Sequence, residues 1–182
     1  SESGWLLLWT PPNFSTAGCA SVAPAVLPRE IRAMTTRPIP DALASGPFRL
    51  STAEHAGVTR SQLRGRSFSR PFRGVHVVGA ASGLRELCEA ALVVLPHAVF
   101  SDATAAALLG LPTWSSGVVH VTTPRDRPAV RRRGIVGHVR DLTSHEIGHV
   151  DGLPVTSAAR TYVDLAGELV RPQLLAVGDA LV

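Results

Sequence analysis

The chain has 182 residues, of which 45% are hydrophobic, so it is long enough to bury the core of one or two small domains. It contains 18 basic and 14 acidic residues, for a formal net charge of +4, and every basic residue is an arginine. The absence of lysine excludes a P-loop, a Schiff-base enzyme and the lysine-containing site of restriction-type nucleases.

The first 45 residues are rich in proline, serine, threonine and alanine and have no clear hydrophobic period. This composition predicts a disordered N-terminal extension over residues 1–45. Met34 is the only methionine, and the run Met-Thr-Thr-Arg resembles a natural start of translation. We therefore expect Met34 to be the functional start and residues 1–33 to be dispensable.

The apolar run near the beginning of the chain is short, lacks a basic segment before it and is followed by Pro11 and Pro12. These features exclude a signal peptide and a membrane span in this stretch. The two cysteines, Cys19 and Cys88, are far apart and belong to no motif, which favours free thiols in a reducing compartment. The sequence thus predicts a cytoplasmic protein with no membrane partner.

Residues 46–80 carry the signals of a winged helix-turn-helix. Two capping-box patterns follow each other, Ser51 with Glu54 and Thr59 with Gln62. Gly57 lies between them and can adopt the positive φ that ends a helix. Two short helices joined by a turn with glycine form a helix-turn-helix, and the β-branched segment from residue 71 is typical of a strand or wing.

The charge of this region points to DNA. Six arginines and no acidic residue lie between residues 55 and 85, and such a surface attracts phosphates. The alternative is a small helical hairpin whose basic face is only solvated. The predicted DNA-binding residues in this region are Thr59, Arg60, Ser61, Gln62, Arg64, Arg66, Arg70 and Arg73.

Residues 81–182 predict a small mixed α/β domain, so the whole chain is expected to be of the α+β class. The hydrophobic period and the stop signals predict helices at 84–95, 101–109, 156–169 and from Pro172 onward, and extended segments at 99–100, 118–122, 135–140 and 153–155. In the third helix Ala159, Tyr162, Val163, Ala166 and Leu169 are expected to face inward. The chain ends within its last predicted helix, which predicts that this domain is truncated.

Five arginines lie between residues 125 and 133, where a hairpin is expected to join the strands at 118–122 and 135–140. Arg131, Arg132 and Arg133 are therefore a second candidate DNA-binding segment, with a solvated loop as the alternative. Residues 134–182 hold three arginines and six acidic residues, so the basic character is confined to the preceding part of the chain.

One stretch matches a zinc-protease motif. His145, Glu146 and His149 have the H-E-x-x-H spacing, which on a helix would place two zinc ligands one turn apart. The helix could begin only near Ser144, and Gly148 would soon disrupt it. We therefore treat the motif as a coincidence and expect no cofactor, no metal and no enzymatic activity.

Two other groups of titratable residues have simpler explanations. His120 and His138 are expected to face each other on paired strands, as ordinary hydrogen-bonded histidines rather than metal ligands. Asp164, Glu168 and Asp179 lie on predicted helices without an evident basic partner, which favours a solvated face.

The motifs, taken as a set, resemble those of the AbiEi-type antitoxin family and of related proteins in which the same region precedes a very-short-patch-repair-like endonuclease domain. The segments that carry the resemblance are AGVTRSQLRG at 56–65, RPFRGVHV at 70–77, SDATAAALLGLP at 101–112, VHVTTPR at 119–125, DGLPVTSAART at 151–161 and VGDALV at 177–182. This chain departs from relatives that have histidine at the position of Asp102. It also contains no nuclease segment up to Val182.

The resemblance implies a winged helix that binds double-stranded DNA, followed by a domain with antitoxin activity. The first hypothesis is a DNA-binding transcriptional regulator, the antitoxin of a type IV toxin–antitoxin (abortive infection) system with a cognate toxin as partner. The alternative is the DNA-recognition region of an endonuclease whose catalytic domain lies beyond this chain. A zinc metalloprotease using His145, Glu146 and His149 is the least favoured hypothesis.

Overall fold

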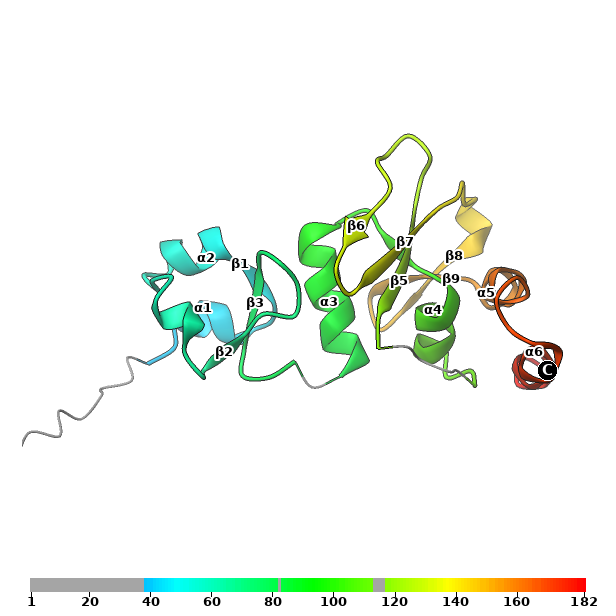
Figure 1. The fold of residues 1–182 in the computed structure, drawn as a ribbon, viewed down its shortest axis with the longest axis horizontal. Helices are drawn as coiled ribbons and strands as arrows, with labels where there is room; N and C mark the ends of the chain where they lie inside the picture. The colour runs from blue at the N-terminus through cyan, green and yellow to red at the C-terminus, as the bar shows by residue number, and fades with distance from the viewer. Residues whose placement is uncertain (1–37, 82, 113–116) are drawn as a thin grey trace, which may run out of the picture. The chain divides into compact units, whose positions relative to one another are not determined.

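The computed structural model describes residues 38–81, 83–112 and 117–182. It has the expected mixture of helices and strands, arranged in a three-stranded sheet of order β1-β3-β2 and a six-stranded sheet of order β6-β7-β5-β4-β9-β8 (Figure 1). Within these three ranges, no helix is both long and apolar enough to cross a membrane.

The first part of the described chain consists of short elements. They are α1 (Asp41–Ala44), β1 (Phe48–Arg49), α2 (Leu50–His55), the 3-10 helix η1 (Gln62–Arg64), β2 (Phe68–Ser69) and β3 (Val75–Val78). Leu43, Phe48, Ala53, Val58 and Leu63 form their buried core. The predicted disordered extension over 1–45 is therefore too long, because α1 lies within it and Leu43 is fully buried. Residues 1–37, including Met34 and Cys19, lie outside the described part.

The start of α2 differs from the prediction, and its end agrees with it. Pairing of β1 with β3 keeps Arg49 extended, so the helix begins at Leu50 and Ser51 lies inside it without a capping bond. At the other end Gly57 has φ +76°. Its backbone N–H donates to the Glu54 carbonyl at 3.0 Å, and that of Val58 donates to the Ala53 carbonyl at 2.9 Å. These two bonds form a Schellman motif.

The second capping pattern forms but does not start a full helix. The backbone N–H and hydroxyl of Thr59 donate to Gln62 Oε1 at 2.8 and 2.9 Å. Only the single 3-10 turn of η1 follows, which is shorter than the predicted second helix. The reason is tertiary, because β2 must pair with β3 from Phe68 onward and few residues remain between.

The six-stranded sheet contains the remaining strands. They are β4 (Val99–Phe100), β5 (Val119–Thr123), β6 (Arg131–Arg132), β7 (Ile135–Val139), β8 (Ile147–Val150) and β9 (Leu153–Thr156). The strand predictions at 99–100, 118–122, 135–140 and 153–155 agree within one residue, but the predicted hairpin is wrong. β5 and β7 are parallel, and the connection between them includes β6, which pairs antiparallel with β7.

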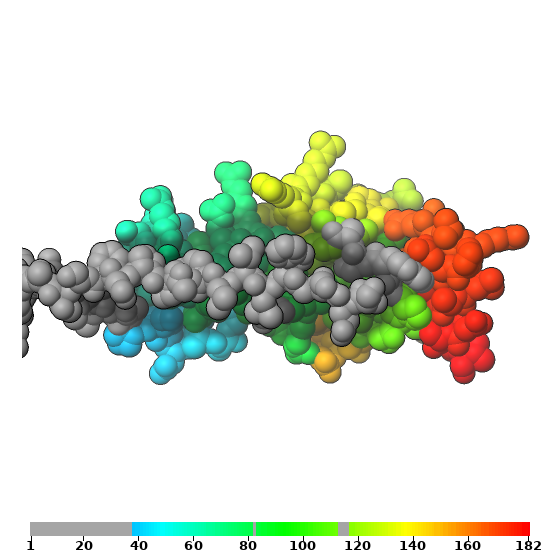
Figure 2. Space-filling model, turned by 60° about the horizontal axis from the view of Figure 1, so that its bottom comes forward, coloured from blue at the N-terminus to red at the C-terminus, as the bar shows by residue number. Residues whose placement is uncertain are grey.

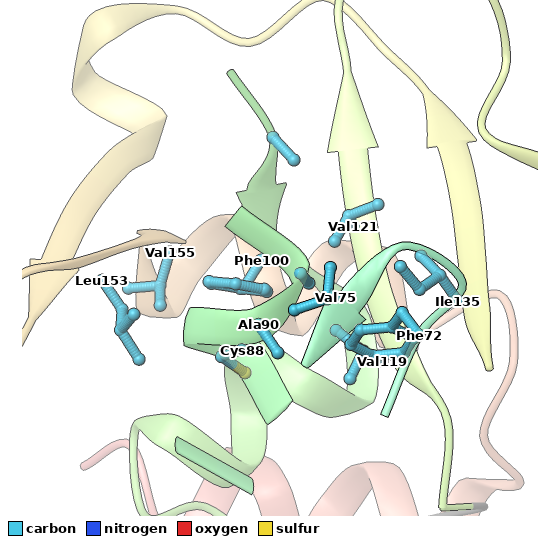
Figure 3. Close-up of a cluster of buried hydrophobic side chains, with 12 residues drawn as sticks. Phe72, Val75, Cys88, Ala90, Phe100, Val119, Val121, Ile135, Leu153 and Val155 are labelled. Atoms are coloured by element: carbon cyan, nitrogen blue, oxygen red, sulfur yellow. The ribbon is translucent and has the colours of Figure 1, made fainter. Parts of the chain in front are cut away.

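One face of this sheet is apolar. Phe100, Val121 and Val155 are side by side on it because they occupy paired positions on β4, β5 and β9. The helix α3 (Leu84–Val94) covers this face with Cys88, Ala90 and Ala91 (Figures 1 and 3). Phe72 and Val75 join the same cluster, so residues on both sides of the predicted domain boundary at 80 share one core.

The other face is covered by α4 (Asp102–Leu108) and α5 (Ala158–Leu165), and α6 (Arg171–Asp179) packs beside α5 (Figure 1). The boundaries agree with the prediction for α4. α6 begins one residue before the predicted Pro172 but ends at Asp179, so the predicted helix that runs to the end of the chain is wrong. α5 is shorter than predicted and is capped by Ser157, since Thr156 ends β9. Its predicted inward face is only partly correct, since Tyr162 and Leu169 are half-buried against a core cluster but Ala159, Val163 and Ala166 are exposed. Val163 is 62% exposed, whereas Thr161 and Asp164 are buried.

Candidate functional site

The predicted DNA-binding residues of the first region lie on exposed surface. Thr59, Arg60 and Ser61 precede η1, Gln62 and Arg64 belong to it, Arg66 follows it, and Arg70 and Arg73 lie at the base and turn of the β2–β3 hairpin. Arg60 makes an exposed ion pair with Glu54 at 3.0 Å. Among the described residues, Arg64, Arg66, Arg70 and Arg73 have no acidic partner within ion-pair distance, so their charges are open to solvent.

Gln62 is less available for reading bases than the sequence suggests. Its side-chain oxygen already accepts two hydrogen bonds from Thr59. Bidentate recognition of adenine by glutamine uses both the oxygen and the nitrogen of the amide. Gln62 must therefore release Thr59 before it can make that contact.

The second candidate segment meets the first. Arg131 and Arg132 form β6 and Arg133 follows in the turn to β7, all three exposed. Arg132 Nη1 donates to the backbone carbonyl of Arg73 at 3.1 Å. Arg70, Arg73, Arg131, Arg132 and Arg133 are called the joined basic surface below. The sequence presented its two halves as separate candidate segments, and the structure brings them into contact.

A hollow of about 540 Å³ lies next to this surface. It is lined by residues 94–98 at the end of α3 and by residues 127–132, including Arg131 and Arg132. The segment around 125–133, yellow-green in Figure 2, projects from the molecular surface. Arg125 belongs to a separate exposed pair with Asp141 at 3.0 Å.

The zinc-protease motif does not have the geometry that its chemistry needs. His145 lies in the 3-10 turn η2 (Ser144–Glu146) and His149 lies on β8, so they do not share a helical face. Glu146 closes a capping box with Thr143 and pairs with Arg160 at 3.0 Å. The pKa of Glu146 is lowered by hydrogen bonds from the Thr143 backbone and from Arg160. This carboxylate is an acceptor in a capping network, not a base facing a metal.

A buried charge network lies between the polar face of the sheet and the helices α4 and α5. Asp102 is fully buried, and its carboxylate accepts hydrogen bonds from Nη1 and Nη2 of Arg140 at 2.9 and 3.2 Å. Arg140 also lies 3.3 Å from Asp164 Oδ2. Arg160 joins Asp164, at 2.8 Å, to Glu146. The predicted solvated face at Asp164 is therefore wrong, because Arg140, which follows β7, and Arg160, one turn earlier on α5, pair with its carboxylate in the interior.

The two strand histidines extend this network. His120 Nδ1 and His138 Nε2 are 3.2 Å apart and their rings stack, which confirms that they face each other. His138 Nε2 also lies 3.4 Å from Asp102 Oδ2. Desolvation by burial lowers the pKa of His120, against the opposing effect of the Asp102 carboxylate. Burial therefore favours the neutral form of the His120 ring.

Asp102 combines burial, charge and backbone strain. Desolvation by burial raises the pKa of its carboxyl, but hydrogen bonds led by that from Arg140 outweigh this, and the pKa lies below its usual range. The residue has φ +50°, a conformation that costs most residues about 1–3 kcal/mol. Such a combination is typical of functional sites.

Asp102, Arg140 and Arg160 were not among the site residues predicted from the sequence. One signal was present: along β5 and β7 polar residues alternate with apolar ones, as in His120 and Thr122. Period-two alternation predicts a sheet with one polar face. Alternation alone does not show what covers the polar face, and in the structure α4 and α5 cover it.

No model of a known protein family matches the chain. The chain is 32% identical over 121 residues to an uncharacterized protein of Mycobacterium tuberculosis, found in strains CDC 1551 / Oshkosh and H37Rv. The match covers 65% of this chain and 43% of each relative, so the chain spans less than half of their length.

Proposed function

We propose that this chain is a DNA-binding transcriptional regulator of the antitoxin type, acting in the cytoplasm on double-stranded DNA. The observation that carries the proposal is the contact between Arg132 and Arg73, which merges two groups of exposed arginines into the joined basic surface. The β2–β3 hairpin serves as the wing of a reduced winged helix in which η1 replaces the second helix.

Phosphate contacts supply most of the affinity in this proposal. The joined basic surface presents five guanidinium groups, and each one that neutralises a phosphate releases counterions. Guanidinium groups also match phosphate oxygens in bidentate geometry. The single turn of η1 offers Arg64 and, after release from Thr59, Gln62 for contacts to base edges. We therefore expect strong salt dependence and modest sequence selectivity.

The test is a salt titration of affinity for double-stranded DNA. Arg73→Ala should lower affinity for all sequences and reduce the slope of log affinity against log salt by about one unit. An Arg131/Arg132/Arg133 triple-alanine variant should reduce it by about two to three units. Arg171→Ala, an exposed arginine on α6, is the matched control and should change neither quantity.

The outcomes separate the two halves of the surface. If only the triple variant loses affinity, the wing has no role in binding. If the Arg171 control loses as much as Arg73→Ala, binding follows net charge and the proposed surface is wrong. Gln62→Ala should cost roughly 1–3 kcal/mol on a preferred sequence and little elsewhere if Gln62 contacts a base.

One observation favours a second candidate function. More than half of each mycobacterial relative lies outside the match, which leaves room in those proteins for another domain. In this alternative, the chain is the DNA-recognition region that precedes a very-short-patch-repair-like endonuclease domain. Cleavage of mismatched DNA by a full-length relative would support it. Neutralisation of a nucleotidyltransferase-like toxin on co-expression with this chain would instead support the antitoxin.

A further inference from the structure

We propose that Asp102, His120 and His138 form a binding site for one zinc ion, independent of the DNA-binding surface. One oxygen of Asp102 and one nitrogen from each histidine all lie within 4.8 Å of one another. Two histidines and a carboxylate are a common zinc ligand set, and three protein ligands leave the fourth tetrahedral position open.

The distances fit a tetrahedral ion. With zinc–ligand bonds near 2.0–2.1 Å, neighbouring ligand atoms of a tetrahedron are about 3.3 Å apart. His120 Nδ1 lies 3.2 Å from His138 Nε2, and His138 Nε2 lies 3.4 Å from Asp102 Oδ2. Two of the three ligand–ligand edges thus already have the required length. An ion between these atoms would replace the direct contact of the two facing nitrogens.

The charges around the cluster also favour a cation. The connected network contains three carboxylates, those of Asp102, Glu146 and Asp164, and only the two guanidinium groups of Arg140 and Arg160. The network therefore carries one negative charge in excess. Glu168 adds a further carboxylate that acts electrostatically on His120. A bound divalent cation would neutralise this excess.

Arg140 does not prevent Asp102 from binding metal. A carboxylate has about four lone-pair positions, and Arg140 uses one on each oxygen. Arg140 therefore leaves one lone pair on Oδ2, the atom that faces His138. Hydrogen bonds to a ligating carboxylate orient it, as outer partners do in many metal sites. Arg140 is assigned this positioning role.

A second buried polar group lies beside the cluster. Thr122 is paired in register with His138 on the same face of the sheet. It is 1% exposed, and its hydroxyl has no hydrogen-bond partner among the described residues. A water in the open coordination position would provide a polar partner on this face. The three ligands come from the start of α4, from β5 and from β7, so the ion would tie α4 to the sheet.

The experiment uses the full chain without a histidine tag, stripped of metal with a chelator. Titration with Zn²⁺ alone should give one site per chain, and Zn²⁺ should raise the melting temperature. His138→Ala and His120→Ala should each weaken binding by at least about 100-fold. A His145→Ala/His149→Ala double variant is the matched control, since it removes two exposed histidines outside the cluster, and it should bind like the parent.

Asp102→Asn is a second variant that should keep the fold, because asparagine tolerates a positive φ and has the same shape as aspartate. It should remain folded by circular dichroism and bind Zn²⁺ at least about tenfold more weakly. Substitution with Co²⁺ should give the visible absorption of a tetrahedral site in the parent and not in His138→Ala. The proposal is overturned by unchanged binding in folded His138→Ala, by no binding to the parent, or by binding lost in the control.

Discussion

The two faces of the six-stranded sheet are both covered by helices, but one buries apolar side chains and the other buries charged and hydroxyl side chains. Under α3, aliphatic and aromatic side chains pack around Phe100 and Val121 and need no specific partners (Figure 3). Under α4 and α5, the buried residues include Asp102, Thr161 and Asp164. The two carboxylates pair with the positive charge of Arg140, and the Thr161 hydroxyl is hydrogen-bonded to that of Thr156. The apolar face tolerates any close packing, whereas the polar face requires particular residues at particular positions.

The largest effect is expected on the apolar face. Phe100→Ala removes a fully buried ring at the centre of the sheet and should lower the free energy of unfolding by about 3–5 kcal/mol. Urea denaturation measures this. Leu175→Ala, on a side chain that is 64% exposed, is the control and should stay within about 0.5 kcal/mol. A loss below 1 kcal/mol at Phe100 would mean that this face is not the main core.

Breaking the polar face should cost nearly as much. Arg140→Met leaves Asp102 and Asp164 buried with one cation fewer, and the expected loss is about 3 kcal/mol. Arg125→Met is the matched control, because it breaks the exposed pair with Asp141 and should cost less than about 1 kcal/mol. Equal losses in the two variants would show that the network contributes no more than a surface ion pair.

A smaller effect tests the orientation of α5. The hydroxyls of Thr156 and Thr161 are 2.8 Å apart in the interior. Thr161→Ala should therefore lower stability by roughly 1–2 kcal/mol by leaving a buried hydroxyl without its partner. Val163→Ser changes an exposed position on the same helix and should stay within about 0.5 kcal/mol. A larger loss of stability in Val163→Ser than in Thr161→Ala would mean that α5 buries the face that contains Val163, as the sequence predicted.

The gentlest way to perturb the polar face is pH. Burial lowers the pKa of His120 below its ordinary value of 6.5, so the unfolded chain takes up the proton first on acidification. The contribution of His120 to the free energy of unfolding should therefore be constant above about pH 6.5. It should fall as the pH drops from there toward the lower pKa of the folded state.

His120→Gln should reduce this acid sensitivity in melting curves between pH 7.5 and 5.5. Some should persist, because the pKa of His76 is also lowered, first by burial and then by Arg70. An identical pH dependence in the parent and the variant would exclude His120 as its source.

Short-range signals predicted the element types well. Gly57 ends α2 and Gly110, with φ +74°, ends α4, because glycine adopts positive φ without a steric penalty. α3 ends just before Pro96, because proline cannot continue a helix. The facing of His120 and His138 followed from alternation along two strands. Each of these predictions depends on residues within a few positions of one another, which the sequence displays directly.

Tertiary structure decided the rest. β5 pairs in parallel with β7, which β6 flanks at the sheet edge, and α5 presents Asp164 to Arg140 of another segment. Arg140 and Asp102 are separated by 38 residues, and Arg132 and Arg73 by 59. The sequence by itself determined where glycine, proline and alternating side chains break the chain into helices and strands, since those preferences are local. The charge network and the joined basic surface exist only in the folded chain, because a charge selects its partner by distance in space.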